Sequence, residues 1–194
     1  YPQVQQRWQL IKTILNLLTV ADDIEAELKS LSGGPLELLQ AYTATEGPWC
    51  LLDTYQRHLE RQSHLFDFQA KHASLEQAIT RARQRYLQVG SELAERFLRD
   101  LSAAQFTIPG ALKQVDIYGK RLAPALATAK TAYVLVDALR FEMGRELANR
   151  LRDGHAVSLE AAIATVPTLT PIGMGALMPG ASDGAEVVQL GPSK

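Results

Sequence analysis

A short apolar run that ends on an acid constrains the fold of this chain more than any other feature. Residues 133–136 read Tyr-Val-Leu-Val, and Asp137 follows them directly. A continuous run of this length, rich in β-branched residues, is typical of a strand that helices bury on both faces. The sequence therefore predicts a parallel strand with Asp137 at its carboxyl end. Ligands bind outside such strand ends, which makes Asp137 a candidate ligand for a metal or a phosphate.

The helix expected over 138–152 gives Asp137 a second interpretation. Aspartate is a favoured N-cap residue, because its carboxylate accepts hydrogen bonds from the first amides of a helix. This helix carries Leu139, Met143 and Leu147 on its apolar side. A cap is therefore the structural alternative to a ligand role, and the spacing alone leaves both open.

A threonine pair between prolines follows the second predicted strand, at 162–166. The sequence Pro-Thr-Leu-Thr-Pro at 167–171 leads into a helix that reaches Leu177. Proline is favoured at the first helical position, which makes Thr170 the expected N-cap. Unpaired amides and the helix dipole favour an anion there, so Thr170 is a candidate for presenting its oxygen to a phosphate, with Thr168 less favoured. An ordinary N-cap is the alternative.

Together these two motifs resemble the opening of a PglZ domain, a branch of the alkaline-phosphatase superfamily. The sequences VLVDALRFEMGREL at 134–147 and PTLTPIGMGALMPG at 167–180 carry the resemblance. It implies that Asp137 is a ligand of a divalent metal ion such as zinc, manganese or magnesium. It also implies that Thr170 is both the nucleophile and a metal-associated oxygen in a hydrolase of phosphate esters, either a phosphatase, a phosphodiesterase or a nuclease.

The resemblance also suggests how the chain is organised. It covers about residues 129–194, and the stretch before it is similar in character to the helical region that precedes PglZ domains in bacterial phage-defence (BREX-type) proteins. We therefore expect an α + α/β fold, with a helical region at 1–128 and the first part of an alkaline-phosphatase-like parallel-sheet domain at 129–194. The superfamily supplies further Asp and His ligands well after the nucleophile. We accordingly expect an internal segment of a longer protein, inactive by itself.

The implied partners follow from the same resemblance. They are a phosphate-ester substrate, with nucleic acid as one candidate, and other proteins of a defence complex. A non-catalytic scaffold within such a complex is the alternative function, because a fold does not fix an activity. Further Asp and His ligands later in the full-length sequence would favour the enzyme, and their lack would favour the scaffold.

Composition restricts the chemistry and the location. The 20 basic and 21 acidic residues leave a net charge of −1, so no global excess attracts nucleic acid or an anionic membrane. Cys50 is the only cysteine, which excludes an internal disulfide and a cysteine-based zinc site. No apolar run approaches the roughly 20 residues of a membrane span. We expect a cytoplasmic protein without a membrane partner.

Apolar periodicity predicts that the residues up to about 128 are helical. Residues 3–19 predict an amphipathic helix whose apolar stripe includes Trp8 and Leu15, and a second helix is expected to start at Asp22. A further helix is predicted over 112–127. The longest segment, at 74–101, has a coiled-coil-like seam that calls for a partner helix, most simply one within the chain. The seam consists of Leu75, Ile79, Ala82, Tyr86, Val89, Leu93 and Phe97.

The same segment has a basic side. Its arginines are Arg81, Arg83, Arg85, Arg96 and Arg99. Such a side is able to contact nucleic-acid phosphates. The favoured interpretation is a solvated face whose arginines pair with acids such as Glu76, Glu92 and Glu95.

Overall fold

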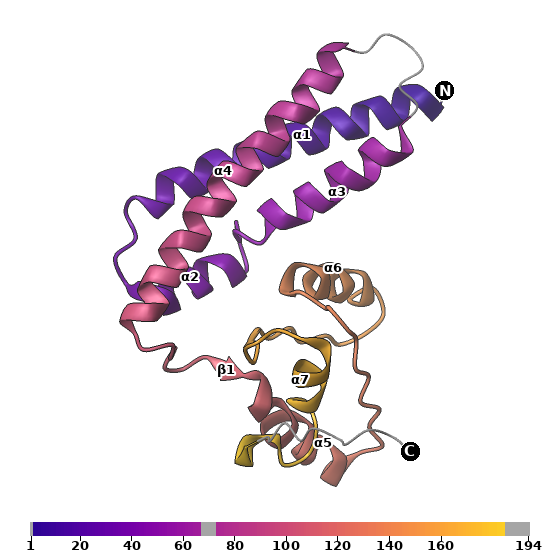
Figure 1. The fold of residues 1–194 in the computed structure, drawn as a ribbon. Coiled ribbons are helices and arrows are strands. Elements are labelled where there is room, and N and C mark those ends of the chain that lie inside the picture. The colour runs from indigo at the N-terminus through magenta and orange to yellow at the C-terminus, as the bar shows by residue number, and fades with distance from the viewer. Residues whose placement is uncertain (1, 67–72, 185–194) are drawn as a thin grey trace, which may run out of the picture. The chain divides into compact units, whose positions relative to one another are not determined.

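A computed structural model describes residues 2–66 and 73–184 of the chain (Figure 1). Contacts divide these residues into two units. The helical unit holds the described residues up to Pro109 together with Phe141–Leu147, and the α/β unit holds Gly110–Arg140 and the described residues from Ala148 onward. In the part of the chain that the structure describes, no helix is long and apolar enough to cross a membrane.

The helical unit contains four long elements before residue 104. They are α1 (Pro2–Leu28), α2 (Gly34–Thr43), α3 (Leu51–Leu65) and α4 (Ala73–Ala103) (Figure 1). No strand occurs among the described residues of this part. The predicted α + α/β fold, with a helical region first and a partial α/β region after it, is confirmed. The domain boundary near residue 128 stays a prediction.

The first helix is longer than the sequence predicts. The prediction that a second helix starts at Asp22 is wrong, because α1 runs without interruption to Leu28. Nothing between residues 19 and 23 ends a helix, since this stretch has no glycine or proline. Ala21 and Ile24 are fully buried and continue the apolar face, while Asp22 is exposed. Its carboxylate pairs with Arg85 of α4 instead of starting a helix.

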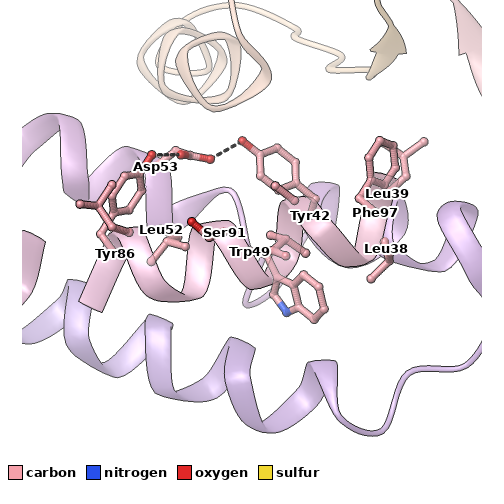
Figure 2. A pocket seen from close by; sticks show the side chains of 13 residues that line it. Leu38, Leu39, Tyr42, Trp49, Leu52, Asp53, Tyr86, Ser91 and Phe97 are labelled. Atoms are coloured by element: carbon pink, nitrogen blue, oxygen red, sulfur yellow. Dashed lines mark hydrogen bonds between the residues drawn. The ribbon is translucent and has the colours of Figure 1, made fainter. Parts of the chain in front are cut away.

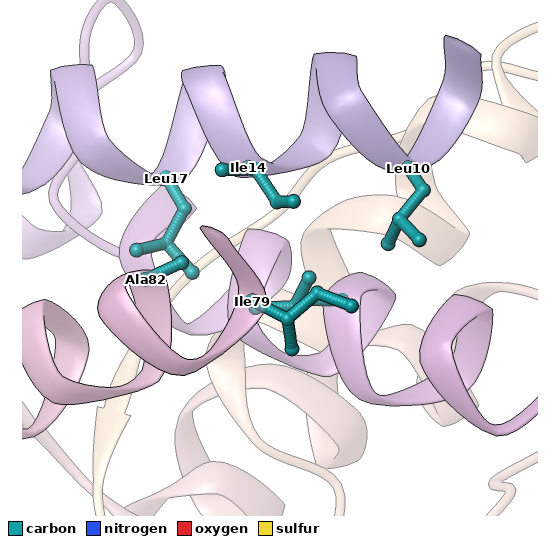
Figure 3. Packing of buried hydrophobic residues seen from close by; sticks show 6 residues of the cluster. Leu10, Ile14, Leu17, Ile79 and Ala82 are labelled. Atoms are coloured by element: carbon teal, nitrogen blue, oxygen red, sulfur yellow. The ribbon is translucent and has the colours of Figure 1, made fainter. Parts of the chain in front are cut away.

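The core lies where α1, α3 and α4 pack together, and Figure 3 shows its first layer. The predicted seam of α4 faces this core, and its internal partners are α1, α2 and α3. One buried cluster consists of Leu10, Ile14, Leu17, Leu59, Ile79 and Ala82. The next consists of Ala21, Ile24, Leu38, Trp49, Leu52 and Val89. Burial of these aliphatic and aromatic side chains is the main stabilising contribution in this unit.

The apolar stripe predicted for α1 is not the face of the helix that is buried. Trp8 and Leu15 are 66% and 58% exposed, whereas Leu10 and Leu17 are buried. The helix carries apolar residues on two faces, and periodicity alone does not tell which face the neighbouring helices cover. Packing against α3 and α4 selects the face of Leu10 and Leu17.

The first half of α6 (Phe141–Leu151) is held within the helical unit by polar contacts. The Arg145 guanidinium donates hydrogen bonds to the carbonyl oxygens of Ala44 and Thr45, at 2.6 and 2.7 Å. The Glu146 carboxylate pairs with Arg57, and it lies 2.7 Å from the Nε2 atom of His58. These contacts fasten residues 141–147 to the loop after α2 and to α3.

This attachment is expected to weaken in acid. Burial acts to raise the pKa of Glu146, but the hydrogen bond and charge of Arg57 and the charge of His58 outweigh it and leave that pKa below its ordinary value. A lowered carboxyl pKa contributes stability that is present above the unfolded pKa of about 4.3 and is lost as the pH falls through the folded pKa. Thermal unfolding between pH 3 and pH 7 checks this, with Glu146→Gln as the control. The variant should lose about 1 kcal/mol at neutral pH and show a shallower loss in acid; an unchanged acid dependence would contradict the assignment.

The α/β unit contains a two-stranded parallel sheet. Strand β1 (Leu112–Lys113) pairs with β2 (Ala162–Ile163), with Leu112 opposite Ala162 and Lys113 opposite Ile163. Short helical elements surround this pair. They are a 3₁₀ turn at Gln114–Asp116, a π-helical turn at Tyr118–Leu122, α5 (Ala123–Thr128), α7 (Thr170–Gly175) and a 3₁₀ turn at Ala181–Asp183.

Two predicted elements of this unit are wrong. Residues 133–136 form no strand, and Val134 and Val136 are 76% and 49% exposed. A buried strand needs ladder partners, and within the described residues the partner of β2 is β1. The helix expected over 112–127 is also wrong. This stretch starts with β1, and only its last part, α5, is an α-helix.

Candidate functional site

The structure brings Asp137 and Thr170 together across thirty-three positions of sequence. The Thr170 hydroxyl lies 3.3 Å from each carboxylate oxygen of Asp137 and donates toward both. This distance is long for an O–H···O hydrogen bond, whose usual range ends near about 3.0 Å. Both residues are exposed to solvent. Three oxygen atoms therefore face one small, accessible volume.

Asp137 does not cap the helix that follows it, so the capping alternative is wrong. Helix α6 begins at Phe141, and its N-cap residue is Arg140, without a side-chain capping bond. The Asp137 carboxylate instead accepts a hydrogen bond from the Ala138 amide at 2.9 Å. Ala138 has a φ of 53°, a left-handed conformation that is unfavourable for a residue with a Cβ. The backbone thus turns sharply directly after the acid and leaves its outer oxygens accessible.

Thr170 is the first residue of α7, and the N-cap is Leu169, one position earlier than predicted. Its hydroxyl forms no capping bond and points to Asp137 instead. The ordinary N-cap interpretation is therefore wrong for this side chain as well. Pro171 still occupies the first turn, where its missing amide hydrogen costs nothing.

A cavity of about 320 Å³ in the α/β unit has Asp137, Thr168 and Thr170 in its wall. Arg140 also lines it, which places one cation beside the paired oxygens. The remaining wall is largely apolar and includes Val136, Leu139, Leu169, Met174 and Leu177. The sequence-predicted site residues therefore share one small cavity.

Two residues that support this site were missed by sequence reasoning. The Gln114 side chain accepts a hydrogen bond from the Thr165 amide at 2.9 Å and donates one to the Gly173 carbonyl at 3.0 Å. The Tyr133 hydroxyl donates to the Leu177 carbonyl at 3.2 Å. Gln114 stands in no motif. Tyr133 begins the apolar run at 133–136, but nothing in that run indicates a hydrogen bond to Leu177. Gln114 holds the segment that carries Thr170 against the end of β1, and Tyr133 ties the start of the segment that carries Asp137 to Leu177.

The donor atoms fit part of a divalent-metal site. Two carboxylate oxygens and a hydroxyl are hard ligands of the kind that magnesium, manganese and zinc accept. Oxygen ligands bonded to one ion at about 2.1 Å lie about 3 Å from each other, close to the observed 3.3 Å. Between residues 2 and 66 and between 73 and 184, no three His, Cys, Asp or Glu side chains gather as a metal site requires. Asp137 and Thr170 therefore suit two positions of a ligand set and do not complete one.

A larger cavity, of about 470 Å³, lies in the helical unit between α2, α3 and α4 (Figure 2). Its one carboxylate, Asp53, is already engaged, since Tyr42 and Tyr86 donate hydrogen bonds to its two oxygens at 2.6 and 2.9 Å. Burial raises the pKa of the neighbouring Cys50 thiol to about 11, which keeps it protonated and unreactive at neutral pH. These groups tie three helices together and offer no activated nucleophile.

The basic side of α4 is largely paired within the helical unit. The acids are not the predicted Glu76, Glu92 and Glu95, but residues on other helices and one on α4 itself. Arg83 pairs with Glu60, Arg85 with Asp22 and Glu25, and Arg96 with Asp100. Because these arginines already have anionic partners, the pairs support the interpretation of a structural, solvated face.

A comparison with known families matches the segment that contains both site residues. Residues 117–186 match the family model described as the BREX system PglZ alkaline phosphatase-like domain. Residues 117–186 are therefore similar to a PglZ domain, and we call them the PglZ segment. The PglZ segment includes Asp137, Thr170 and the helix between them, and it begins after Gln114. No curated protein and no solved structure matches the chain.

Proposed function

We propose that the PglZ segment contributes to a hydrolase of phosphate mono- or diesters, with Thr170 as the nucleophile and with Asp137 and Thr170 as metal ligands. The observation that carries this proposal is the convergence of the Asp137 carboxylate and the Thr170 hydroxyl at 3.3 Å. Two independent helix caps would not direct their side chains to a common point. The match to an alkaline phosphatase-like domain supports the same chemistry.

Thr170 is the attacking group in this proposal. Its O–H points at Asp137, which leaves the lone pairs of Oγ1 available to a phosphorus atom in the cavity. As the bond from Oγ1 to phosphorus forms, the ester P–O bond breaks, and the leaving alkoxide takes a proton from solvent and departs as the alcohol. The hydroxyl proton leaves along its hydrogen bond to Asp137 and passes to solvent. Water then hydrolyses the phosphothreonine, which restores the free hydroxyl and releases phosphate or a monoester.

Asp137 has two tasks. It orients the Thr170 hydroxyl through its hydrogen bond, and its carboxylate supplies a negative ligand for a divalent cation. Such an ion, when bound, would neutralise charge on the phosphoryl oxygens and lower the pKa of the hydroxyl. Arg140 lines the same cavity and adds positive charge toward an anionic substrate. The proposal includes nucleic acid as a candidate diester substrate. It also includes binding to other proteins of a defence complex.

Metal removal tests the proposed function. Chelation of the full-length protein is expected to abolish hydrolysis of a chromogenic phosphodiester, and added manganese or zinc should restore it, because the metal-associated hydroxyl is the attacking group. Asp137→Ala should lower both turnover and manganese affinity. The matched control is Asp116→Ala, since Asp116 pairs with Lys120 at 2.9 Å and does not line the cavity. Full turnover in the presence of chelator, or full activity of the Asp137 variant, would refute the assignment of the site. No turnover by the metal-loaded full-length protein would favour the scaffold.

A further inference from the structure

We propose that Gln114 is a positioning residue of this site, one that sets where the Thr170 hydroxyl lies. This inference rests on the proposed function, because it assigns Gln114 a role in aiming the nucleophile. Gln114 precedes residues 117–186, so the family match assigns it nothing. Its side chain lines the same cavity as Asp137 and Thr170.

The contacts of Gln114 are specific for an amide side chain. Its Oε1 atom faces the Thr165 N–H at 2.9 Å, and its Nε2 atom faces the Gly173 carbonyl at 3.0 Å. The Thr165 N–H can only donate a hydrogen bond, and the Gly173 carbonyl can only accept one. A terminal amide meets both needs at once, whereas a carboxylate lacks the donor and an aliphatic chain lacks both. The two partners also fix which way the amide is turned.

These two contacts hold both ends of the segment that carries the nucleophile. Thr165 lies just after β2, Gly173 lies within α7, and Thr170 stands between them. A Cβ built on Gly173 would meet the Gln114 amide nitrogen at 3.6 Å, and no other atom within 4 Å. Gln114 is thus the group packed against this face of α7. Holding both ends restricts where the first turn of α7, and therefore Thr170, can lie.

Gln114 is itself anchored to the sheet. It follows β1 directly, and β1 pairs in parallel with β2. Parallel strands end at the same edge of a sheet, so Gln114 and Thr165 emerge there side by side. We call the two hydrogen bonds of Gln114, to Thr165 and Gly173, the clamp. It connects the edge of the sheet to α7 through one side chain.

The test uses substitutions that separate positioning from general stability. Gln114→Met keeps the side-chain length and removes both hydrogen bonds. Gln114→Glu keeps the acceptor for the Thr165 amide and sets a carboxylate against the Gly173 carbonyl. Gln88→Met is the matched control, because Gln88 is exposed on α4 and donates a hydrogen bond to Glu92 of the same helix, at 3.2 Å. Amide hydrogen exchange, kcat and KM are measured for each folded full-length variant.

The clamp predicts a combined result. Protection of the Thr165 amide should fall about tenfold in Gln114→Met, as expected for the loss of a partly buried hydrogen bond. In both Gln114 variants kcat should fall about tenfold or more, while KM stays within about twofold, since a misaimed nucleophile slows chemistry more than binding. Gln88→Met should change none of these three quantities.

Three outcomes would overturn the inference. Unchanged exchange at Thr165 would show that the clamp does not exist in solution. Lower protection with wild-type kcat per folded molecule would show a structural tie without a positioning role. Full activity of Thr170→Ala would show that Thr170 is not the nucleophile, so Gln114 would have no nucleophile to position. That outcome is a failure of the proposed function. The exchange data would still report separately on the two hydrogen bonds of Gln114.

Discussion

Replacing Thr170 by alanine is expected to lower kcat of the full-length protein by about three orders of magnitude or more, because the attacking oxygen is removed. Folding should be unaffected, since the hydroxyl forms no capping bond and the residue is exposed. Manganese affinity should fall only slightly, because Asp137 remains. Steady-state kinetics with a chromogenic phosphodiester, together with a thermal melt, check each expectation.

The matched control for this experiment is Thr168→Ala. Thr168 has the same side chain, lies two residues earlier and lines the same cavity, but no hydrogen bond joins it to Asp137. It should retain activity within about an order of magnitude, the range expected for a wall residue that does not react. Equal losses in the two variants would show that the threonine motif acts through local structure, and an active Thr170 variant would rule out Thr170 as the nucleophile.

Truncating Leu17 to alanine is expected to destabilise the helical unit by about 2–5 kcal/mol. Leu17 is fully buried in the layer between α1 and α4, where Ala82 lies opposite it (Figure 3). Removing its methyl groups leaves a cavity that close-packed neighbours fill only in part. Denaturant unfolding followed by far-ultraviolet circular dichroism measures the loss.

Leu15→Ala provides the comparison on the same helix. Leu15 is 58% exposed, so the same change of side chain should cost no more than about 0.5 kcal/mol. Stability changes of similar size in the two variants would mean that the face of α1 toward α3 and α4 is misassigned. A larger effect at Leu15 would restore the stripe that periodicity predicts.

The sequence predicts the helices well because their signals are local. The seam along α4 combines a regular period with many turns, and the structure buries Ile79, Ala82 and Val89 as expected. What periodicity does not supply is the choice between two apolar faces, as α1 shows. That choice depends on which helices pack against it, and their arrangement is not encoded in a single segment.

The strands were predicted less well because a strand is defined by its partner. Residues 133–136 have strand composition but no ladder, while the unremarkable pair Leu112–Lys113 forms β1. The resemblance nevertheless implies that Asp137 and Thr170 lie close together, because it makes both of them ligands in a metal site. In the structure no strand ends at Asp137. Tyr133 ties the Asp137 segment to Leu177, and Gln114 holds the Thr170 segment against the end of β1. Hydrogen bonds of this kind join distant segments, and one sequence does not reveal them.

The most direct measurement is the search for a phosphoryl group on Thr170. The full-length protein is mixed with a phosphate ester and manganese, quenched in acid during turnover, and digested for mass spectrometry. The proposed chemistry predicts a phosphothreonine at position 170, formed at a rate no slower than turnover and lost in Asp137→Ala. Turnover without any phosphorylated residue, or phosphate found on a different side chain, would contradict the assignment of Thr170 as the nucleophile.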